Sequence, residues 1–210
     1  MTEAPIQLER EGDVFIVSMT ADENRWNTTF VRAFNAALDE IESSTDPVAM
    51  ITASMDEKFF SNGLDLEWMA AQGEHPGGDR DVFGSEYMAL CARLITFPVP
   101  TVAAVNGHAF GAGFMIALCH DLRIMREDRG YLCANEVEIG MTIPEPELAL
   151  FDTRFRWVPF MKRLYLHVAG RARQPRTRAS CTRPRAWRTC ARSRCRQLKG
   201  NLVWRKIAKY

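Results

Sequence analysis

A glycine-rich segment, Val105–Met115 (VNGHAFGAGFM), is the first place where this sequence could do chemistry. Its glycines at 107, 111 and 113 stand where a predicted strand runs into a predicted helix, and they permit positive φ and close backbone approach. Backbone N–H groups at a helix start can bind an anion such as a phosphate. The dinucleotide fingerprint GxGxxG is not met, because Ile116 stands where its third glycine belongs.

A second candidate segment is Lys58–Glu67 (KFFSNGLDLE), in which Gly63 follows an aromatic pair and a small polar residue. By itself this pattern predicts a turn between a strand and a helix. Asp65 has a structural interpretation as the cap of a helix that starts at Leu66, and we favour that interpretation.

Four further side chains could transfer protons. Histidine side chains ordinarily titrate near neutral pH, but we expect His108 and His120 to be structural, with His108 bonded to the backbone of the glycine turn. Glu136 and Glu138 belong to the stretch 135–140 and by themselves indicate acids on an exposed loop. If that stretch is extended, the two carboxylates share one face.

Together and in this order, the segments resemble the crotonase (enoyl-CoA hydratase/isomerase) superfamily. The most specific piece is AAVNGHAFGAGFMIALCHD, followed by ANEVEIGMTIP at 134–144. The resemblance runs from about Ile6 to Leu150, with a weak return near Gln197–Lys209. It implies an α/β crotonase-like spiral of ββα units and an acyl-CoA substrate. Coenzyme A would be present only as part of that substrate, with no metal and no redox cofactor.

The resemblance also implies the binding residues. In that family two backbone N–H groups hold the thioester oxygen as it becomes an enolate, and by motif position they belong to Leu64 and Ala112. Preorganised donors of this kind act where negative charge develops. The remaining substrate-binding positions implied by the resemblance are Phe60, Asn62, Gly63, Asp65, Leu66, Gly111 and Met115.

The acid/base positions separate the subfamilies. Family hydratases carry one Glu just after the glycine motif and a second on a later loop, whereas double-bond isomerases keep only the second. Here the first position is Met115 and the second is Glu136, with Glu138 as the rival base. The pattern therefore resembles a Δ3,Δ2-enoyl-CoA isomerase. The alternatives are an enoyl-CoA hydratase that uses Glu136 alone and a damaged homologue without catalysis.

The elements that must position these residues follow from hydrophobic periodicity. A β-hairpin is predicted at 6–18 with Gly12–Asp13 at its turn, and strands are predicted at 48–54, 101–105 and 122–125. Helical spacing of apolar residues covers 27–43 and 83–96, with a buried helical turn at 114–119. Strands that alternate with helices indicate βαβ units around a mainly parallel sheet.

Composition adds outer bounds. The 210 residues suffice for one substantial core, and no apolar run approaches the ~20 residues of a membrane span. With no signal-peptide core at the N-terminus, we expect a cytoplasmic protein. Cysteines 91, 119 and 133 stand in apolar surroundings and are expected to be core thiols, while 181, 190 and 195 lack zinc-ligand spacing.

The C-terminal part departs from this pattern. We assign 1–150 to the acyl-CoA-binding core and 151–210 to an atypical region, within which 152–196 is expected to be irregular. Residues 171–196 hold ten Arg, no acid and no Leu, Ile, Val or Phe, the composition of an out-of-frame reading of GC-rich DNA. A nucleic-acid-binding tail is the alternative. Relatives assemble as homotrimers or hexamers through C-terminal helices, which this region would have to supply.

Overall fold

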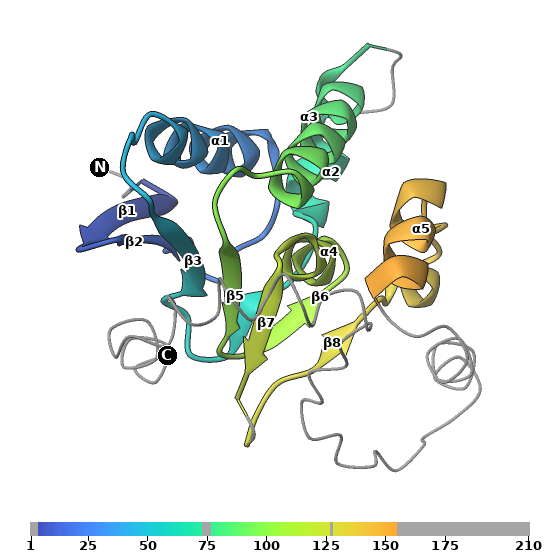
Figure 1. Ribbon diagram of the computed structural model, residues 1–210. Helices are drawn as coiled ribbons and strands as arrows, with labels where there is room; N and C mark the ends of the chain where they lie inside the picture. The colour runs from blue at the N-terminus through green and yellow to red at the C-terminus, as the bar shows by residue number, and fades with distance from the viewer. Residues whose placement is uncertain (1–3, 73–76, 127, 155–210) are drawn as a thin grey trace.

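The computed structural model describes residues 4–72, 77–126 and 128–154. A five-stranded sheet has the order β1-β2-β3-β5-β7 and a three-stranded sheet the order β4-β6-β8 (Figure 1). Among the described strands, only β1, at one edge, runs antiparallel to its neighbour, and the other pairings are parallel. The predicted α/β class with a mainly parallel sheet is therefore confirmed.

The hairpin and the first helix form as the sequence predicts. Strands β1 (Ile6–Glu11) and β2 (Val14–Met19) pair in the register Glu11–Val14, and Gly12 has φ 61° in the turn. Helix α1 (Thr28–Glu42) is capped by the side chain of Asn27, which accepts a hydrogen bond from the N–H of Phe30. Its apolar face, spaced every three to four residues, is buried.

The chain then repeats one pattern, in which a strand of the large sheet is followed by a strand of the small sheet and by helix. The first unit contains β3 (Ala49–Ser54), β4 (Phe59–Ser61), α2 (Leu66–Ala71) and α3 (Asp79–Ile95). The second contains β5 (Thr101–Val105), β6 (His108–Phe110) and α4 (Ala112–Cys119). The third contains β7 (Leu122–Met125), β8 (Leu132–Cys133), a 3₁₀ turn η1 (Glu136–Ile139) and α5 (Glu145–Arg154). This repetition is the predicted spiral of ββα units.

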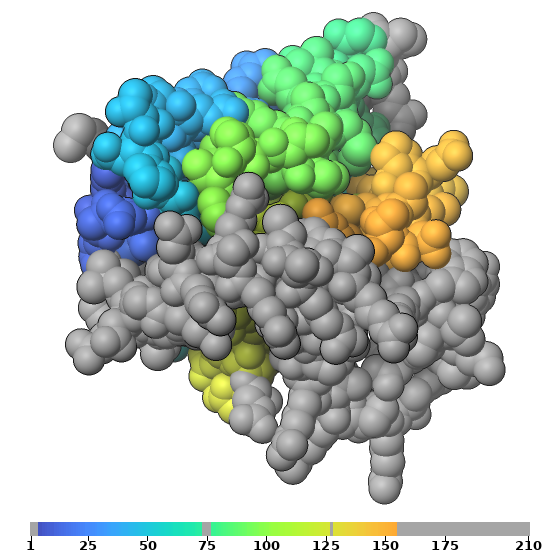
Figure 2. All heavy atoms as spheres, in the orientation of Figure 1, coloured from blue at the N-terminus to red at the C-terminus, as the bar shows by residue number. Residues whose placement is uncertain are grey.

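Helix α3 begins four residues before the predicted Phe83. Gly78 is its N-cap residue, and Asp79 and Asp81 lie in its first turn, where negative charge stabilises a helix start. This polar turn carries little apolar periodicity, so hydrophobic spacing alone could not locate it. Helices α1 and α3 lie side by side on one side of the molecule (Figure 2).

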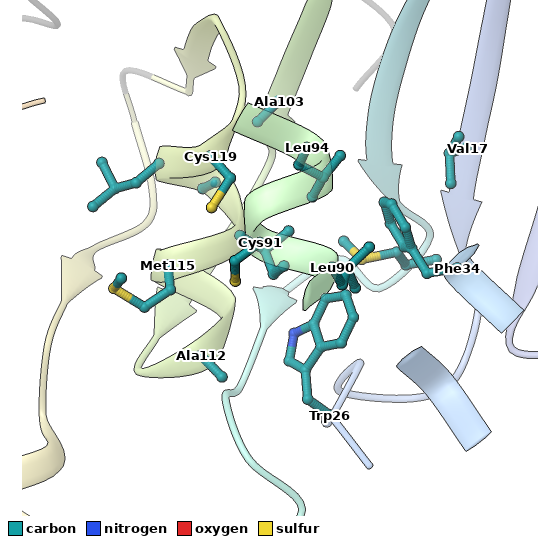
Figure 3. Packing of buried hydrophobic residues seen from close by; sticks show 14 of the residues in the cluster. Val17, Trp26, Phe34, Leu90, Cys91, Leu94, Ala103, Ala112, Met115 and Cys119 are labelled. Carbon is teal, nitrogen blue, oxygen red and sulfur yellow. The ribbon is translucent and has the colours of Figure 1, made fainter. Parts of the chain in front are cut away.

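The core lies between the helices and the sheets. Figure 3 shows part of it, with Trp26 and Phe34 on one side of α3 and Met115 and Cys119 of α4 on the other. Cys91 and Cys119 are buried in it as expected, whereas Cys133 is only half-buried. No helix among the described residues is long and apolar enough to cross a membrane.

Helix α5 continues through Arg154, so the first three residues of the segment 152–196, expected to be irregular, are helical. Leu150 and Phe151 lie on the buried face of this helix, and the ring of Phe151 stacks on that of Phe114 in α4. This packing against α4 stabilises the helix, and composition alone did not predict it. The rest of that segment, including the Arg-rich stretch, lies outside the described residues, and so do the expectations for 197–210.

Candidate functional site

The first site loop connects β4 to α2. Trp26 donates its N–H to the carbonyl of Gly63 at 2.8 Å, and Asp65 donates its N–H to the carbonyl of Trp26 at 3.0 Å. This is the bonding of a parallel bridge centred on Leu64. In such a bridge the N–H of the central residue points away from its partner. The N–H of Leu64 is therefore directed to the opposite side, away from Trp26.

The second site loop connects β6 to α4. Gly111 is the N-cap residue of α4, with φ 45° and ψ −120°, a conformation that favours glycine. Ala112 is the first residue of the helix, and the first N–H groups of any α-helix have no partner inside it. The carbonyl of Ala112 accepts a hydrogen bond of 2.6 Å from the hydroxyl of Tyr87, and this bond holds the helix start in place.

The two loops are in contact, and Gly63 is what allows their approach. A β-carbon on Gly63, which has φ 86°, would lie 2.9 Å from the carbonyl oxygen of Phe110 and 3.8 Å from the nitrogen of Ala112. The backbone of the first loop thus lies directly beside the helix start that offers the Ala112 N–H. The structure brings together the two backbone segments that the sequence named.

A buried network behind the first loop holds it in this position. The indole N–H of Trp26 donates to Oγ of Ser61 at 3.0 Å, and that hydroxyl donates to the carbonyl of Asn24 at 2.7 Å. The N–H of Gly63 also donates to Oγ of Ser61, at 3.3 Å. Sequence reasoning did not identify Trp26 or Ser61 as supports, because the two residues meet only in the folded chain.

Glu136 places a carboxyl group against the second loop. Its side chain is only 6% exposed, and Oε1 lies 3.2 Å from the point that a β-carbon on Gly111 would occupy. Oε2 has no hydrogen-bond partner among the described residues. Burial raises the pKa of Glu136, because the charged form loses hydration. A carboxyl group whose pKa is raised in this way is better able to hold a proton that it has accepted and then to return it.

Glu138 does not share the face of Glu136. The stretch 136–139 is a 3₁₀ turn and not an extended strand. In a helix with three residues per turn, side chains two positions apart point in different directions. Glu138 is exposed while Glu136 is buried. Of the two rival acids, only Glu136 faces the glycine loops.

The apolar side chains expected at the site fall into two groups. Leu64 is half-buried and Leu66 is 41% exposed, so both offer apolar surface at the first loop. Phe60 and Met115 are buried in the core, where their side chains support the loops from behind. Burial of Phe60 follows from its position on β4, between the sheet and the helices.

Asn62 and Asp65 bond within the protein. The side-chain amide of Asn62 donates to Oε2 of Glu23 at 2.7 Å. Asp65 caps α2 by accepting from the N–H of Trp68 at 2.9 Å, as expected, and it also accepts from the side chain of Asn27. Both side chains therefore fix the shape of the first loop.

The two histidines have different surroundings. His120 is fully buried; Oγ1 of Thr52 lies 2.8 Å from Nε2 and the carbonyl of Ile116 lies 2.8 Å from Nδ1, which confirms the structural role. The expectation that His108 bonds the backbone is wrong for Nδ1, which is buried and has no hydrogen-bond partner among the described residues. The imidazole ring of His108 instead stacks on the aromatic rings of Phe110 and Tyr131.

One acid was missed. Glu147 lies in the first turn of α5, is 7% exposed, and has an Oε2 without a hydrogen-bond partner among the described residues. Burial and, after it, the charge of Glu136 raise the pKa of Glu147 to about 7. A signal was present in the sequence, since Glu147 precedes Leu150 and Phe151 by three and four residues and so shares their buried helix face.

Within the described parts of the chain, no three His, Cys, Asp or Glu side chains are grouped so that they could hold a metal ion. The expectation of a reaction without metal or redox cofactor rests on the sequence and stays a prediction.

Comparison with known proteins assigns this chain to a family. The family model described as enoyl-CoA hydratase/isomerase matches residues 9–160. The enoyl-CoA delta isomerase 2, peroxisomal, of Arabidopsis thaliana is 36% identical over 141 residues, which cover 66% of this chain and 59% of that protein. A carnitinyl-CoA dehydratase of Salmonella arizonae is 36% identical over 140 residues, or 65% of this chain and 51% of that protein. The chain thus spans little more than half the length of these relatives.

Solved structures share the fold. An enoyl-CoA isomerase of Mycobacterium tuberculosis superimposes with a TM-score of 0.72 at 24% identity, covering 99% of this chain and 90% of that one. An enoyl-CoA hydratase of Mycobacterium ulcerans gives a TM-score of 0.70 at 24% identity, with coverage of 98% and 89%. At such identities the likeness extends to the fold alone.

Proposed function

This chain belongs to the enoyl-CoA hydratase/isomerase family, and from that premise we propose that it is a Δ3,Δ2-enoyl-CoA isomerase. The observation that carries the proposal is the carboxyl group of Glu136 against the Gly111 backbone, at the helix start that offers the Ala112 N–H. The position where family hydratases carry another carboxylate holds Met115, whose thioether cannot transfer a proton.

The proposed reaction needs one base and two donors. The Glu136 carboxylate removes a proton from C2 of a 3-enoyl-CoA, and the electron pair moves through the thioester carbonyl to give a dienolate. The N–H groups of Leu64 and Ala112 stabilise the oxygen as it becomes negative. The protonated Glu136 then returns the proton to C4, so the double bond moves to C2–C3 and no atom is gained or lost.

The environment of Glu136 supports this double role. A base that must later act as an acid works best when its pKa lies near the working pH. Burial raises the pKa of Glu136 in that direction. The start of α4 adds the positive end of its helix dipole near the thioester oxygen, which favours the anionic intermediate.

A second candidate function is hydration of a 2-enoyl-CoA. Two observations favour it: the dehydratase among the relatives, and Glu147, whose buried carboxyl group lies within reach of the charge of Glu136. Addition of water ordinarily uses two carboxyl groups to orient and activate it. Isomerisation remains the better proposal because the delta isomerases are among the similar relatives and the family's first acid position is apolar.

Parallel assays with two substrates distinguish isomerisation from hydration. Purified protein is supplied in parallel with a 3-enoyl-CoA and with a 2-enoyl-CoA in water, and product is followed by the absorbance of the conjugated thioester. We expect isomerisation to outrun hydration clearly, and Glu136→Gln to slow isomerisation by ~10²–10⁴. Faster hydration would reject the isomerase assignment, and absence of both reactions would identify a non-catalytic homologue.

The proposal includes an acyl-CoA as the small-molecule partner. It also includes a homotrimer or hexamer as the assembly if the C-terminal region supplies the helices through which family members assemble. The cytoplasmic location expected from the sequence stays a prediction. Two of the plant relatives carry the word peroxisomal in their names.

A further inference from the structure

Trp26 holds the first site loop through both its backbone and its ring. Its backbone N–H and carbonyl bond to the residues on either side of Leu64, at 2.8 and 3.0 Å. Its indole N–H donates to Oγ of Ser61 at 3.0 Å, and the N–H of Gly63 donates to the same hydroxyl oxygen. Trp26 is fully buried. The position of the Leu64 N–H therefore depends on the position of Trp26.

Tyr87 of α3 holds the second site loop. Its side chain is buried, and its hydroxyl donates to the carbonyl of Ala112 at 2.6 Å. The residue before, Gly111, is bonded on both sides: its N–H donates to the carbonyl of Cys133 at 2.9 Å, and its carbonyl accepts from the N–H of Met115 at 3.0 Å. The N–H and the carbonyl of a trans peptide point in opposite directions. The N–H of Ala112 therefore points out of the helix start, away from Met115.

The rings of Trp26 and Tyr87 are in contact. Their centroids are 5.8 Å apart and their planes are inclined by 68°, which is an edge-to-face pair. Phe30 packs edge-on against Trp26 at 4.6 Å, and Phe83 stacks on Tyr87 at 5.7 Å. Close-packed rings transmit a displacement to their neighbours. One packed contact thus connects the support of the first loop with the support of the second.

We propose that Trp26 and Tyr87 are positioning residues that together set the separation of the two oxyanion donors, the N–H groups of Leu64 and Ala112. This inference rests on the proposed function, in which those donors stabilise the thioester oxygen as it becomes negative. Such donors must lie ~2.7–3.1 Å from the position that the oxyanion takes, so a small change in their separation weakens the stabilisation. Burial raises the pKa of Tyr87, so its hydroxyl keeps the proton that it donates to the carbonyl.

The test uses Trp26→Phe and Tyr87→Phe, which keep an aromatic ring but remove the hydrogen-bond donor, and the double variant. Tyr131→Phe is the matched control, because that ring is 46% exposed and stacks on His108. For each protein kcat and KM are measured with a 3-enoyl-CoA. Urea denaturation gives the folded fraction under the assay conditions, and kcat is corrected for that fraction.

We expect kcat to fall about tenfold in each single variant, less than the ~10²–10³ that loss of a whole donor costs, because the donors are misaligned but not removed. KM should change by no more than about twofold, since the donors act mainly on the transition state. In the double variant the two losses should not multiply, because both substitutions relax the same separation. Tyr131→Phe should keep the kcat of the unmodified chain.

A measurement without turnover tests the donors directly. The infrared stretching frequency of a thioester carbonyl falls when N–H groups bond to its oxygen. An isotope-labelled saturated acyl-CoA is bound to each protein, and its carbonyl band is compared with that of the free ligand. We expect a clear fall for the unmodified chain and Tyr131→Phe, and a smaller fall for Trp26→Phe and Tyr87→Phe. Because the band belongs to the bound ligand, partial unfolding of a variant does not change the result.

These measurements separate the possible failures. A normal carbonyl shift in either Trp26→Phe or Tyr87→Phe would overturn the inference, and so would losses of kcat that multiply in the double variant. Absence of a carbonyl shift in the unmodified chain would also overturn it. A shift that is present in the unmodified chain and reduced in both variants, without isomerisation by any of them, would support the positioning role and reject the proposed isomerase function.

Discussion

Oε1 of Glu136 lies 3.2 Å from the point that a β-carbon on Gly111 would occupy, so the carboxyl group of one residue faces the bare backbone of the other. Gly111 is also the N-cap residue of α4. The relationship joins the proposed base to the helix start that offers the proposed oxyanion donor. Both the reactivity of the site and its response to substitution follow from this contact.

Glu136→Gln removes the base but keeps the size of the side chain. We expect kcat to fall by ~10²–10⁴, the usual contribution of a positioned base, with KM changed much less. Glu138→Gln is the control, because that acid is exposed and lies off the site face. Steady-state kinetics with a 3-enoyl-CoA measures both variants, and a larger loss in Glu138→Gln would contradict the assignment.

Gly111→Ala tests the close approach. The new methyl group would crowd Glu136, and the backbone at φ 45° is strained for any residue with a β-carbon. We expect a loss of about 1–3 kcal/mol in the free energy of unfolding, together with reduced turnover. Urea denaturation measures the first effect.

The control is Gly84→Ala in α3, where an added β-carbon meets nothing within 4 Å. Replacing a helical glycine by alanine in open space stabilises by up to about 1 kcal/mol. The two glycine variants should therefore change stability in opposite directions; equal effects would show that the Gly111 backbone tolerates a side chain.

Asp65→Ala removes the cap of α2. The lost bond to the N–H of Trp68 should cost about 1 kcal/mol of stability, whereas Asp65→Asn keeps an acceptor and should cost only a fraction of that. Thermal unfolding measures the difference. If Asp65→Ala left stability unchanged but weakened acyl-CoA binding strongly, Asp65 would be a ligand-binding residue and not chiefly a cap.

His120 should make the fold sensitive to acid. The carbonyl of Ile116 can only accept, so Nδ1 carries the proton, and Nε2 accepts from Oγ1 of Thr52. Burial lowers the pKa of His120 from 6.5 to about 4. Between these values the unfolded chain binds more protons, so stability is present above pH 6.5 and is lost as the pH falls toward 4.

The size of this contribution is about 3 kcal/mol, from a pKa difference of about 2.5 units. His120→Gln should remove that part of the pH dependence, as urea denaturation at pH 4.5 and 7 would reveal. Glu147 contributes with the opposite sign between about 4.5 and 7, because its pKa is raised in the fold. Each effect is therefore obtained from the difference in the free energy of unfolding between a variant and the unmodified chain. If His120→Gln lost as much stability between pH 7 and 4.5 as the unmodified chain, the prediction for His120 would be wrong.

The sequence by itself determined the elements and the loops between them. Turn and cap residues act over a few positions, so Gly12 in the hairpin and Asp65 at α2 could be placed from the sequence. The spacing of apolar residues likewise predicted the alternation of strands and helices. The order of the two glycine segments indicated which backbone groups would meet, and the close approach of the Gly63 backbone to Phe110, just before Ala112, agrees with that expectation.

Only the tertiary structure decided which acids face the site. The resemblance pointed to Glu136 and left Glu138 as its rival, and the 3₁₀ turn buries the first and exposes the second. Glu147 is buried in the helix α5 that packs against α4, and local sequence patterns do not encode which helices pack together. The physical reason is that burial sets the pKa of a carboxyl group, and burial depends on which elements pack together.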